Sequence, residues 1–293
     1  MLKWMKITKH YRKWFNNFKV MPSVMKIGLI VSKIDEASMG IWGMLRNMIK
    51  FKEVKANEYT SDLALALVST KDIVYIDEAD EWAKANNIDV LLFLSRHEMR
   101  NPKPLITFHT PGNWTSDVEL GGKPGLVAVS EPRVLSNLFR EAYRRIGELS
   151  GYSATLEATH HGPFVDKPAV FVEIGSTSNE WRNPKAQEFL ASLIFDFLND
   201  TNRYINDGKD VAVSIGDLHY ATLTSHIING EYDVGHMVPK YVNPTPMIIR
   251  MAVERNTVKP KLGIIHWKSL NAESRTMVEK ELSKLGLMVV KRR

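Results

Sequence analysis

The stretch Val90-Leu91-Leu92-Phe93-Leu94 is a continuous run of apolar residues. A short run of this kind is typical of a β-strand that is buried on both faces, as in a parallel sheet covered by helices. The run leads directly into Ser95, Arg96 and His97, so reactive side chains follow a buried strand. The same arrangement recurs along the chain and predicts both the fold class and the place of the chemistry.

The rest of the chain alternates between strand-like runs and segments with helical spacing. Helical spacing is expected over residues 38–50, 130–151, 184–199, 247–255 and 272–285, and further strands over 27–31, 63–68, 73–76, 105–108, 154–158, 169–174, 211–215, 262–267 and 287–290. This alternation predicts an α/β fold with a mixed, largely parallel sheet flanked by helices. Because no repeat or break in composition interrupts residues 25–293, we expect them to form a single layered domain.

The positive charge of the chain comes from its first 24 residues. Lys and Arg number 39 against 33 Asp and Glu, and residues 1–24 contain six basic residues and no acid. Residues 25–293 are therefore balanced, with 33 charges of each sign. Residues 1–24 read as a basic N-terminal extension. Its aromatic residues would suit a nucleic-acid arm, whereas a biological start at Met21 or Met25 is the interpretation that we favour.

Composition also limits the metal chemistry and the location. No run approaches eighteen apolar residues, which excludes a transmembrane helix and a membrane partner. The chain has no cysteine, so any zinc ion must be held by His, Asp or Glu, which favours a catalytic site over a sealed structural one. This composition fits the reducing cytoplasm, where we expect the protein to be located.

Polar groups gather after several of the predicted strands. In open α/β sheets, ligands bind beyond the carboxyl ends of the strands. If the strands are parallel, these groups converge on one cleft. They are Arg96 and His97, His160 and His161, Ser176, Thr177 and Glu180, and Asp217 and His219.

Such a cleft suits hydrolysis. An imidazole can act as a general base towards water, or it can bind zinc and lower the pKa of bound water. Glu173 and Glu180 are candidate acids, bases or ligands, and Arg96 could hold an anion. Each of these residues also has a purely structural interpretation. Adjacent residues of an extended segment point to opposite faces, so His160 and His161 share one site only if the turn at Gly162 redirects one of them.

Motifs of other enzyme classes are absent. The sequence contains no P-loop, no glycine-rich dinucleotide motif, no His-Glu-x-x-His helix and no Gly-x-Ser-x-Gly elbow. Without a cysteine or an elbow serine, direct attack by water is favoured over a covalent acyl-enzyme.

With these residues in view, the chain from about residue 25 to its end resembles the archaeal and plant type of D-aminoacyl-tRNA deacylase. The matching motifs are Ser95-Arg96-His97, Thr159-His160-His161-Gly162-Pro163, Glu173-Ile174-Gly175-Ser176-Thr177 with Glu180-Trp181, His219-Tyr220, and Gly235-His236 with Pro239-Lys240-Tyr241. One departure is Gly216-Asp217-Leu218, where the family has a glycine-rich run before the His-Tyr pair.

The resemblance implies hydrolysis of the ester that joins a D-amino acid to the 3′ end of tRNA. It also implies a zinc cofactor and a fold like that of phosphorylases and peptidyl-tRNA hydrolases. On the matched positions, the expected catalytic residues are His160, His161, Glu180 and His97. The expected substrate-binding residues are Arg96, Ser176, Thr177, Trp181, His219, Tyr220 and Lys240. The candidate metal ligands are His160, His97, His219 and His236.

The expected partner is the aminoacylated 3′ end of tRNA, bound by a monomer. Two alternatives stay open from the residues alone. One is an enzyme of the nucleoside phosphorylase type, which would need a phosphate site and an acid that binds ribose. The other is a non-catalytic tRNA-binding module, in which the histidines are structural.

Overall fold

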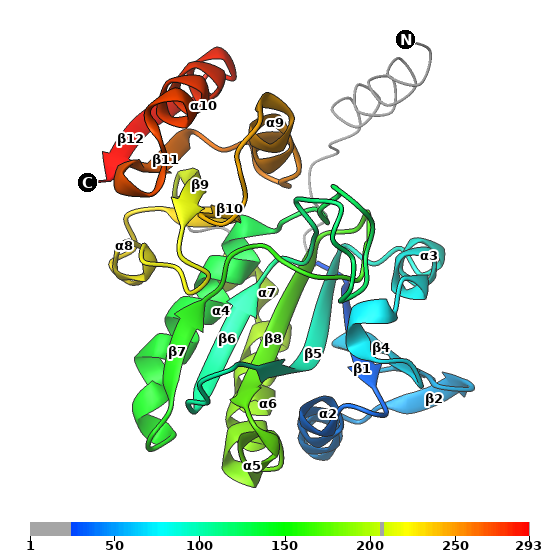
Figure 1. The fold of residues 1–293 in the computed structure, drawn as a ribbon. Helices are drawn as coiled ribbons and strands as arrows, with labels where there is room; N and C mark the ends of the chain where they lie inside the picture. Colours follow the sequence, from blue (N-terminus) through cyan, green and yellow to red (C-terminus); the bar gives the residue numbers. More distant parts are fainter. Residues whose placement is uncertain (1–24, 206–207, 293) are drawn as a thin grey trace.

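A computed structural model describes residues 25–205 and 208–292 of the chain. In the described residues, eight strands form one sheet in the order β2-β3-β4-β1-β5-β8-β6-β7 (Figure 1). These strands are β1 (Ile27–Ser32), β2 (Lys52–Lys55), β3 (Glu58–Thr60), β4 (Ala64–Ser69), β5 (Val90–Glu98), β6 (Leu105–His109), β7 (Ser153–Leu156) and β8 (Ala169–Ser176).

The middle of this sheet is parallel and its two edges are not. Strands β4, β1, β5 and β8 pair in parallel. Strand β6 runs antiparallel to β8, and β7 runs parallel to β6. On the other side, β3 is antiparallel to β4 and β2 is antiparallel to β3. The reversal at β6 matters for the site, because it brings the end of β7 back over the middle of the sheet.

Helices cover one face of the large sheet. They are α2 (Glu36–Met48), α4 (Pro132–Arg145) and α6 (Pro184–Asn199), whose apolar residues form one core with alternate residues of the strands, such as Leu92 and Val172. The intervening strand residues face the other side, where Phe93 stacks on Phe171 with ring centroids 4.7 Å apart. Helix α3 (Glu78–Ala85) packs on this second side through Ala79 and Ala83. Residues 90–94 are thus buried on both faces, as the sequence predicted.

A second sheet follows in sequence and lies beside the first (Figure 1). It is wholly parallel, in the order β10-β9-β11-β12, and it consists of β9 (Val211–Asp217), β10 (Asp233–Pro239), β11 (Leu262–His266) and β12 (Met288–Arg292). Helices α9 (Pro246–Glu254) and α10 (Ala272–Lys284) pack on it. Residues Ala212 and Val234 also belong to the core of the large sheet, so the two sheets share apolar contacts.

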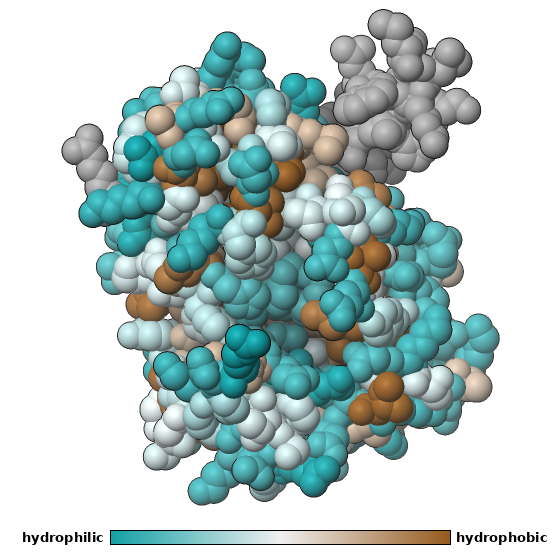
Figure 2. All heavy atoms as spheres, in the orientation of Figure 1, coloured by the Kyte–Doolittle hydropathy of each residue, from teal (hydrophilic) through white to brown (hydrophobic). Residues whose placement is uncertain are grey.

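The remaining elements are short. They are helices α5 (Ser178–Trp181), α7 (Thr201–Ile205) and α8 (Thr224–Ile228) and the 3-10 turns η2 (Ile73–Tyr75), η3 (Ile146–Glu148) and η4 (Trp267–Ser269). In the described ranges, no helix combines the length and the apolar character that crossing a membrane requires. Hydrophilic residues cover most of the face that Figure 2 shows, and hydrophobic residues appear there in small groups.

The predicted α/β fold with a mixed, largely parallel sheet flanked by helices is confirmed. Two details differ from the prediction. Residues 73–76 were expected to be a strand, but they form the 3-10 turn η2 that leads into α3. The strands from β9 onward form their own sheet and do not extend the first. The predicted extension at residues 1–24 lies outside the described residues.

Candidate active site

The candidate site lies on one face of the large sheet, over strands β5, β8 and β6. In the pairing register, Glu173 of β8 lies between Ser95 of β5 and Thr107 of β6. Because side chains alternate along a strand, His97 points to the same face as Glu173 and Thr107. The Thr107 hydroxyl donates a hydrogen bond of 2.9 Å to Glu173 Oε2. His97 lies near the carboxyl end of β5, as predicted, whereas β6 and β7 run against β8, so His109, His160 and His161 reach the site from the opposite direction.

The ring of His97 fills the space beside a glycine of β8. Gly175 pairs with His97, and a Cβ atom on Gly175 would come within 2.7 Å of His97 Cδ2. The ring of His97 is held at both nitrogens. Nε2 lies 2.8 Å from the Tyr220 hydroxyl, and Nδ1 lies 3.2 Å from Glu157 Oε1 and 3.5 Å from Glu173 Oε2.

Glu157 reaches the site from the end of β7. The backbone here pairs with the segment after β9: Ala158 N donates to His219 O at 2.8 Å, and Ala221 N donates to Leu156 O at 2.9 Å. The Glu157 side chain is fully buried. Its Oε2 lies 3.1 Å from His219 Nε2. Its Oε1 is buried without a hydrogen bond, since the approach of His97 lacks hydrogen-bond geometry.

Three further imidazoles meet beside the two carboxylates: His109 at the end of β6, and His160 and His161 after β7. Their ring centroids lie 4.2 to 4.7 Å apart, and one ring nitrogen of each lies within 4.8 Å of the others. In each ring Nδ1 faces a backbone carbonyl: Thr110 O at 3.3 Å, Ala158 O at 2.8 Å and Gly162 O at 2.6 Å respectively. In His160 and His161 these contacts favour a proton on Nδ1 and leave Nε2 with its lone pair. In His109, Nε2 is buried 3.7 Å from Glu173 Oε2, without hydrogen-bond geometry.

The turn at Gly162 brings both adjacent histidines to the same site. His161 adopts a φ of 42°, a left-handed conformation that non-glycine residues seldom adopt. The turn is packed so tightly that a Cβ atom on Gly162 would come within 2.2 Å of Gly122 N. Gly162 N also donates to Leu120 O at 2.9 Å. The loop around residues 120–122 therefore supports the backbone that redirects His161.

The electrostatics divide the imidazoles into two kinds. Burial opposes protonation of His97, but the hydrogen bond to Glu173 and the negative charge of Glu157 outweigh it and raise its pKa to about 9. Burial alone would raise the pKa of both carboxylates, but their imidazole neighbours outweigh this effect. Contacts with His109 and His97 hold the pKa of Glu173 well below its usual value, and the bond to His219 lowers the pKa of Glu157.

His160 and His161 stay neutral at neutral pH. Burial, followed by the neighbouring rings of His109 and His161, holds the pKa of His160 well below 6.5. Burial and His109 lower the pKa of His161 to about 4. At neutral pH the site therefore contains a protonated His97 between two carboxylates, next to neutral imidazoles that can accept a proton or bind a metal.

Several residues expected at the site lie elsewhere. The Arg96 guanidinium points away from His97 and pairs with Asp72 Oδ2 at 2.7 Å, while Asp35 Oδ2 lies 3.6 Å from it. It also lies 5.7 Å from the ring centre of Trp181, whose Nε1 donates to His97 O at 2.9 Å. Arg96 is thus engaged by the chain's own acids, and Trp181 supports the end of β5.

The polar residues after β8 also have local partners. Ser176 Oγ donates to Lys103 O at 2.7 Å. Glu180 accepts from Thr177 N at 2.9 Å and from the Thr177 hydroxyl at 2.6 Å, and together the two residues cap helix α5. The structure does not bring Ser176, Thr177 or Glu180 to the histidine cluster. Lys240 is exposed at the rim, just after β10.

His236 is buried away from the cluster, in contact with its supporting backbone. Its Nδ1 lies 3.0 Å from the Thr159 hydroxyl and its Nε2 lies 2.9 Å from Arg255 O. Burial, followed by the charge of Arg255, lowers its pKa to about 3. Both ring nitrogens are occupied by hydrogen bonds, so the structure does not support the predicted metal-ligand role of His236.

Sequence reasoning assigned no role to His109 and Glu157, which are central to the site. His109 directly follows a predicted buried strand. Glu157 lies on the polar side of the alternating run that leads to His160, together with Thr155, so the pattern predicts an exposed residue. It is nevertheless fully buried, because the segment after β9 and the imidazoles cover it.

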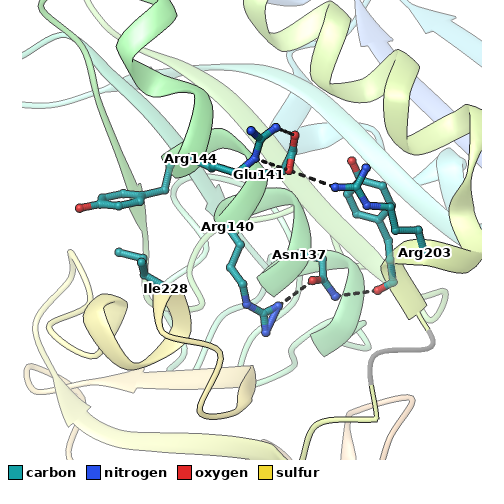
Figure 3. A pocket seen from close by; sticks show the side chains of 8 residues that line it. Asn137, Arg140, Glu141, Arg144, Arg203 and Ile228 are labelled. Atoms are coloured by element: carbon teal, nitrogen blue, oxygen red, sulfur yellow. Dashed lines mark hydrogen bonds and ion pairs between the residues drawn. The ribbon is translucent and has the colours of Figure 1, made fainter.

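One cavity lies outside this site, around helix α4. It has a volume of about 410 Å³ and is lined by Asn137, Arg140, Glu141, Tyr143, Arg144, Arg203, Tyr204 and Ile228 (Figure 3). The arginines of the cavity are bound by the chain itself, as Arg140 donates to Asn137 Oδ1 at 2.8 Å and both Arg144 and Arg203 pair with Glu141. The cavity contains none of the histidines, so we do not assign the chemistry to it.

Comparison with known proteins identifies the family. The family model of D-aminoacyl-tRNA deacylases matches residues 84–290. A D-aminoacyl-tRNA deacylase of Caldivirga maquilingensis is 82% identical over 92% of this chain and all of its own length. One of Pyrococcus abyssi is 31% identical over 91% of this chain and all of its own length. A crystal structure titled as a conserved protein of unknown function aligns with a TM-score of 0.81 at 29% identity, covering 92% of this chain and 96% of the other. The chain belongs to the D-aminoacyl-tRNA deacylase family.

Proposed function

We propose that this protein hydrolyses the ester bond between a D-amino acid and the 3′ end of tRNA, releasing both, at the cluster of His97, His109, Glu157, His160, His161, Glu173 and His219. The names of the relatives give the reaction. The observation that carries the site is the group of three imidazoles, each with Nδ1 facing a backbone carbonyl, beside two buried carboxylates.

An aminoacyl ester is already activated, so its hydrolysis needs a positioned water molecule and stabilisation of the oxyanion more than a strong nucleophile. Neutral His160 and His161 are suited to take a proton from water. His97, with a pKa of about 9, carries its proton at neutral pH and so acts as a donor that holds both carboxylates. Glu157 orients two of the imidazoles, since its Oε1 lies 3.2 Å from His97 Nδ1 and its Oε2 lies 3.1 Å from His219 Nε2.

The same residues fit a zinc ion. His109, His160 and His161 form a three-histidine set of the kind that binds catalytic zinc, and each Nδ1 is held by a carbonyl, which fixes the ring of a metal ligand. The buried Nε2 of His109 without a hydrogen bond is a further sign that this group has an external partner. When bound, zinc would lower the pKa of water and polarise the ester carbonyl.

The first experiment compares hydrolysis of D-Tyr-tRNA and L-Tyr-tRNA by the wild type and by His160→Ala, His161→Ala and Glu157→Gln. We expect turnover of the D-ester only, a loss of turnover in the three variants and unchanged tRNA affinity. His226→Ala is the matched control, because His226 also contacts a carboxylate, Glu231 at 2.8 Å, but lies on α8 outside the cluster. Turnover of nucleosides with phosphate, in place of the ester, would contradict the proposal.

Zinc is tested separately by measuring the metal content of the purified protein and of each variant after dialysis against a chelator and readdition of Zn²⁺. We expect His160→Ala and His161→Ala to lose the bound metal and His226→Ala to behave like the wild type. Full turnover in metal-free protein would remove zinc from the proposal and leave the imidazoles as the bases. A monomeric state and a cytoplasmic location stay predictions.

A further inference from the structure

Tyr241 is an exposed aromatic residue at the rim of the histidine cluster. It follows β10 in a turn in which Val242 N donates to Pro239 O at 3.0 Å. Lys240 N donates to Asp217 O at 2.7 Å, so this turn is tied to the end of β9. Although 64% of Tyr241 is exposed, its hydroxyl lies 3.3 Å from His219 Nδ1. An aromatic ring is thus held in place but left open to solvent.

His219 connects this ring to the cluster. Its ring is nearly parallel to that of Tyr241, at 27° with centroids 6.4 Å apart. On its other side, the His219 centroid is 4.5 Å from that of His160, and its Nε2 lies 3.1 Å from Glu157 Oε2. His219 therefore lies between the exposed ring of Tyr241 and His160 at the proposed site of ester cleavage.

The surroundings of Tyr241 match a nucleotide. Leu218 is 42% exposed beside His219 and adds apolar surface to the rim. Lys240 is exposed next to Tyr241 and adds a positive charge to the rim. A planar aromatic ring with a neighbouring cation is the combination that proteins use for an unpaired base and its phosphate.

We propose that Tyr241 is the residue on which the 3′-terminal adenine base of tRNA stacks while the ester lies at the histidine cluster. This inference rests on the proposed function and adds a subsite to it. The terminal adenosine is common to all tRNAs, so a stack of this kind aligns the ester whichever amino acid it carries. Tyr241 is therefore a positioning residue, not a catalytic one.

The test is a cycle that combines Tyr241→Ala with removal of the terminal adenosine from the tRNA. Stacking on an aromatic ring contributes enough that alanine substitution is expected to weaken binding of full-length deacylated tRNA roughly 10- to 100-fold. Binding of tRNA that lacks the terminal adenosine should be equally weak for wild type and variant. With D-Tyr-tRNA, the KM should rise by a similar factor while kcat changes little.

Two further variants separate the ring from its surroundings. Tyr241→Phe keeps the stacking surface and loses only the contact with His219, so we expect affinity within a few-fold of the wild type. Tyr143→Ala is the matched control, since Tyr143 is 45% exposed on α4, outside the cluster. It should change neither binding nor turnover.

The outcomes are distinguishable. A wild type that cannot hydrolyse D-Tyr-tRNA overturns the proposed function itself. A wild type that hydrolyses it, with Tyr241→Ala binding full-length tRNA normally, overturns the stacking inference alone. So does an equal loss of affinity for the full-length and the shortened tRNA, because the ring would then act on another part of the molecule.

Discussion

Substitution of Gly175 by alanine should damage the site although it replaces no titratable residue. A Cβ atom there would come within 2.7 Å of His97 Cδ2, where ordinary contact begins near 3.4 Å. The ring would have to move by about 0.7 Å or more. It has little freedom to do so, because Tyr220 holds Nε2 at 2.8 Å and the carboxylates of Glu157 and Glu173 flank Nδ1.

Overpacking of this kind costs about 1–3 kcal/mol of unfolding free energy. A catalytic group displaced by up to about 1 Å can lose roughly 10- to 100-fold in rate. We therefore expect Gly175→Ala to lower both the stability in denaturant unfolding and the kcat for D-Tyr-tRNA. Gly43→Ala is the matched control, because Gly43 is exposed in helix α2 and a Cβ atom there would have no neighbour within 4 Å. Alanine at this position should stabilise the protein by about 0.5–1 kcal/mol and leave turnover unchanged.

In this register His97 lies against Gly175 and has no room to shift. Wild-type stability together with wild-type turnover in Gly175→Ala would refute it, because the ring would then have room that the structure does not give it. A loss of stability with normal turnover would keep the register but remove His97 from the chemistry.

Two further predictions concern residues outside the cluster. Burial raises the pKa of Asp35 from 3.8 to about 6, because it outweighs the hydrogen bonds from the amides of Ser38 and Arg96. Between these two pH values the folded state binds more protons than the unfolded state. The free energy of unfolding therefore falls as the pH rises through this window. Asp35→Asn should lack this fall, gaining about 3 kcal/mol relative to wild type between pH 3 and pH 7 in unfolding experiments; equal slopes would contradict it. His236→Ala should lose about 2–4 kcal/mol of stability because buried hydrogen bonds and packing are removed, yet bind zinc as the wild type does, whereas lost metal would restore His236 as a ligand.

The fold could be predicted to the extent that local pattern determines it. The apolar run at residues 90–94 and the helical stripe at 184–199 identified elements correctly, because burial on both faces or on one face leaves a direct mark on composition. Strand direction leaves no such mark. Nothing in residues 105–109 shows that β6 runs against β8, and the division into two sheets depends on contacts between distant segments.

The site was predicted in its residue types more than in its place. His97, His160, His161 and His219 do meet, but His160 and His161 arrive from β7, which runs against β5 and β8. Whether His160 and His161 could share one site depended on the backbone at His161, which the sequence could suggest only through the following Gly-Pro pair. Arg96 and Glu180 carry the right chemistry, yet alternation and a helix cap direct them to other partners.

The charge balance of the cluster gives a physical reason for its open imidazoles. Two buried carboxylates, Glu157 and Glu173, are held ionised and share one protonated imidazole, His97. Buried charge without compensation is costly, and a cation such as the proposed zinc ion would compensate the carboxylates further. The neutral rings of His160 and His161 offer lone pairs where such a cation could bind. The zinc ion that we propose would thus add its positive charge next to the carboxylates, at the lone pairs that these histidines offer.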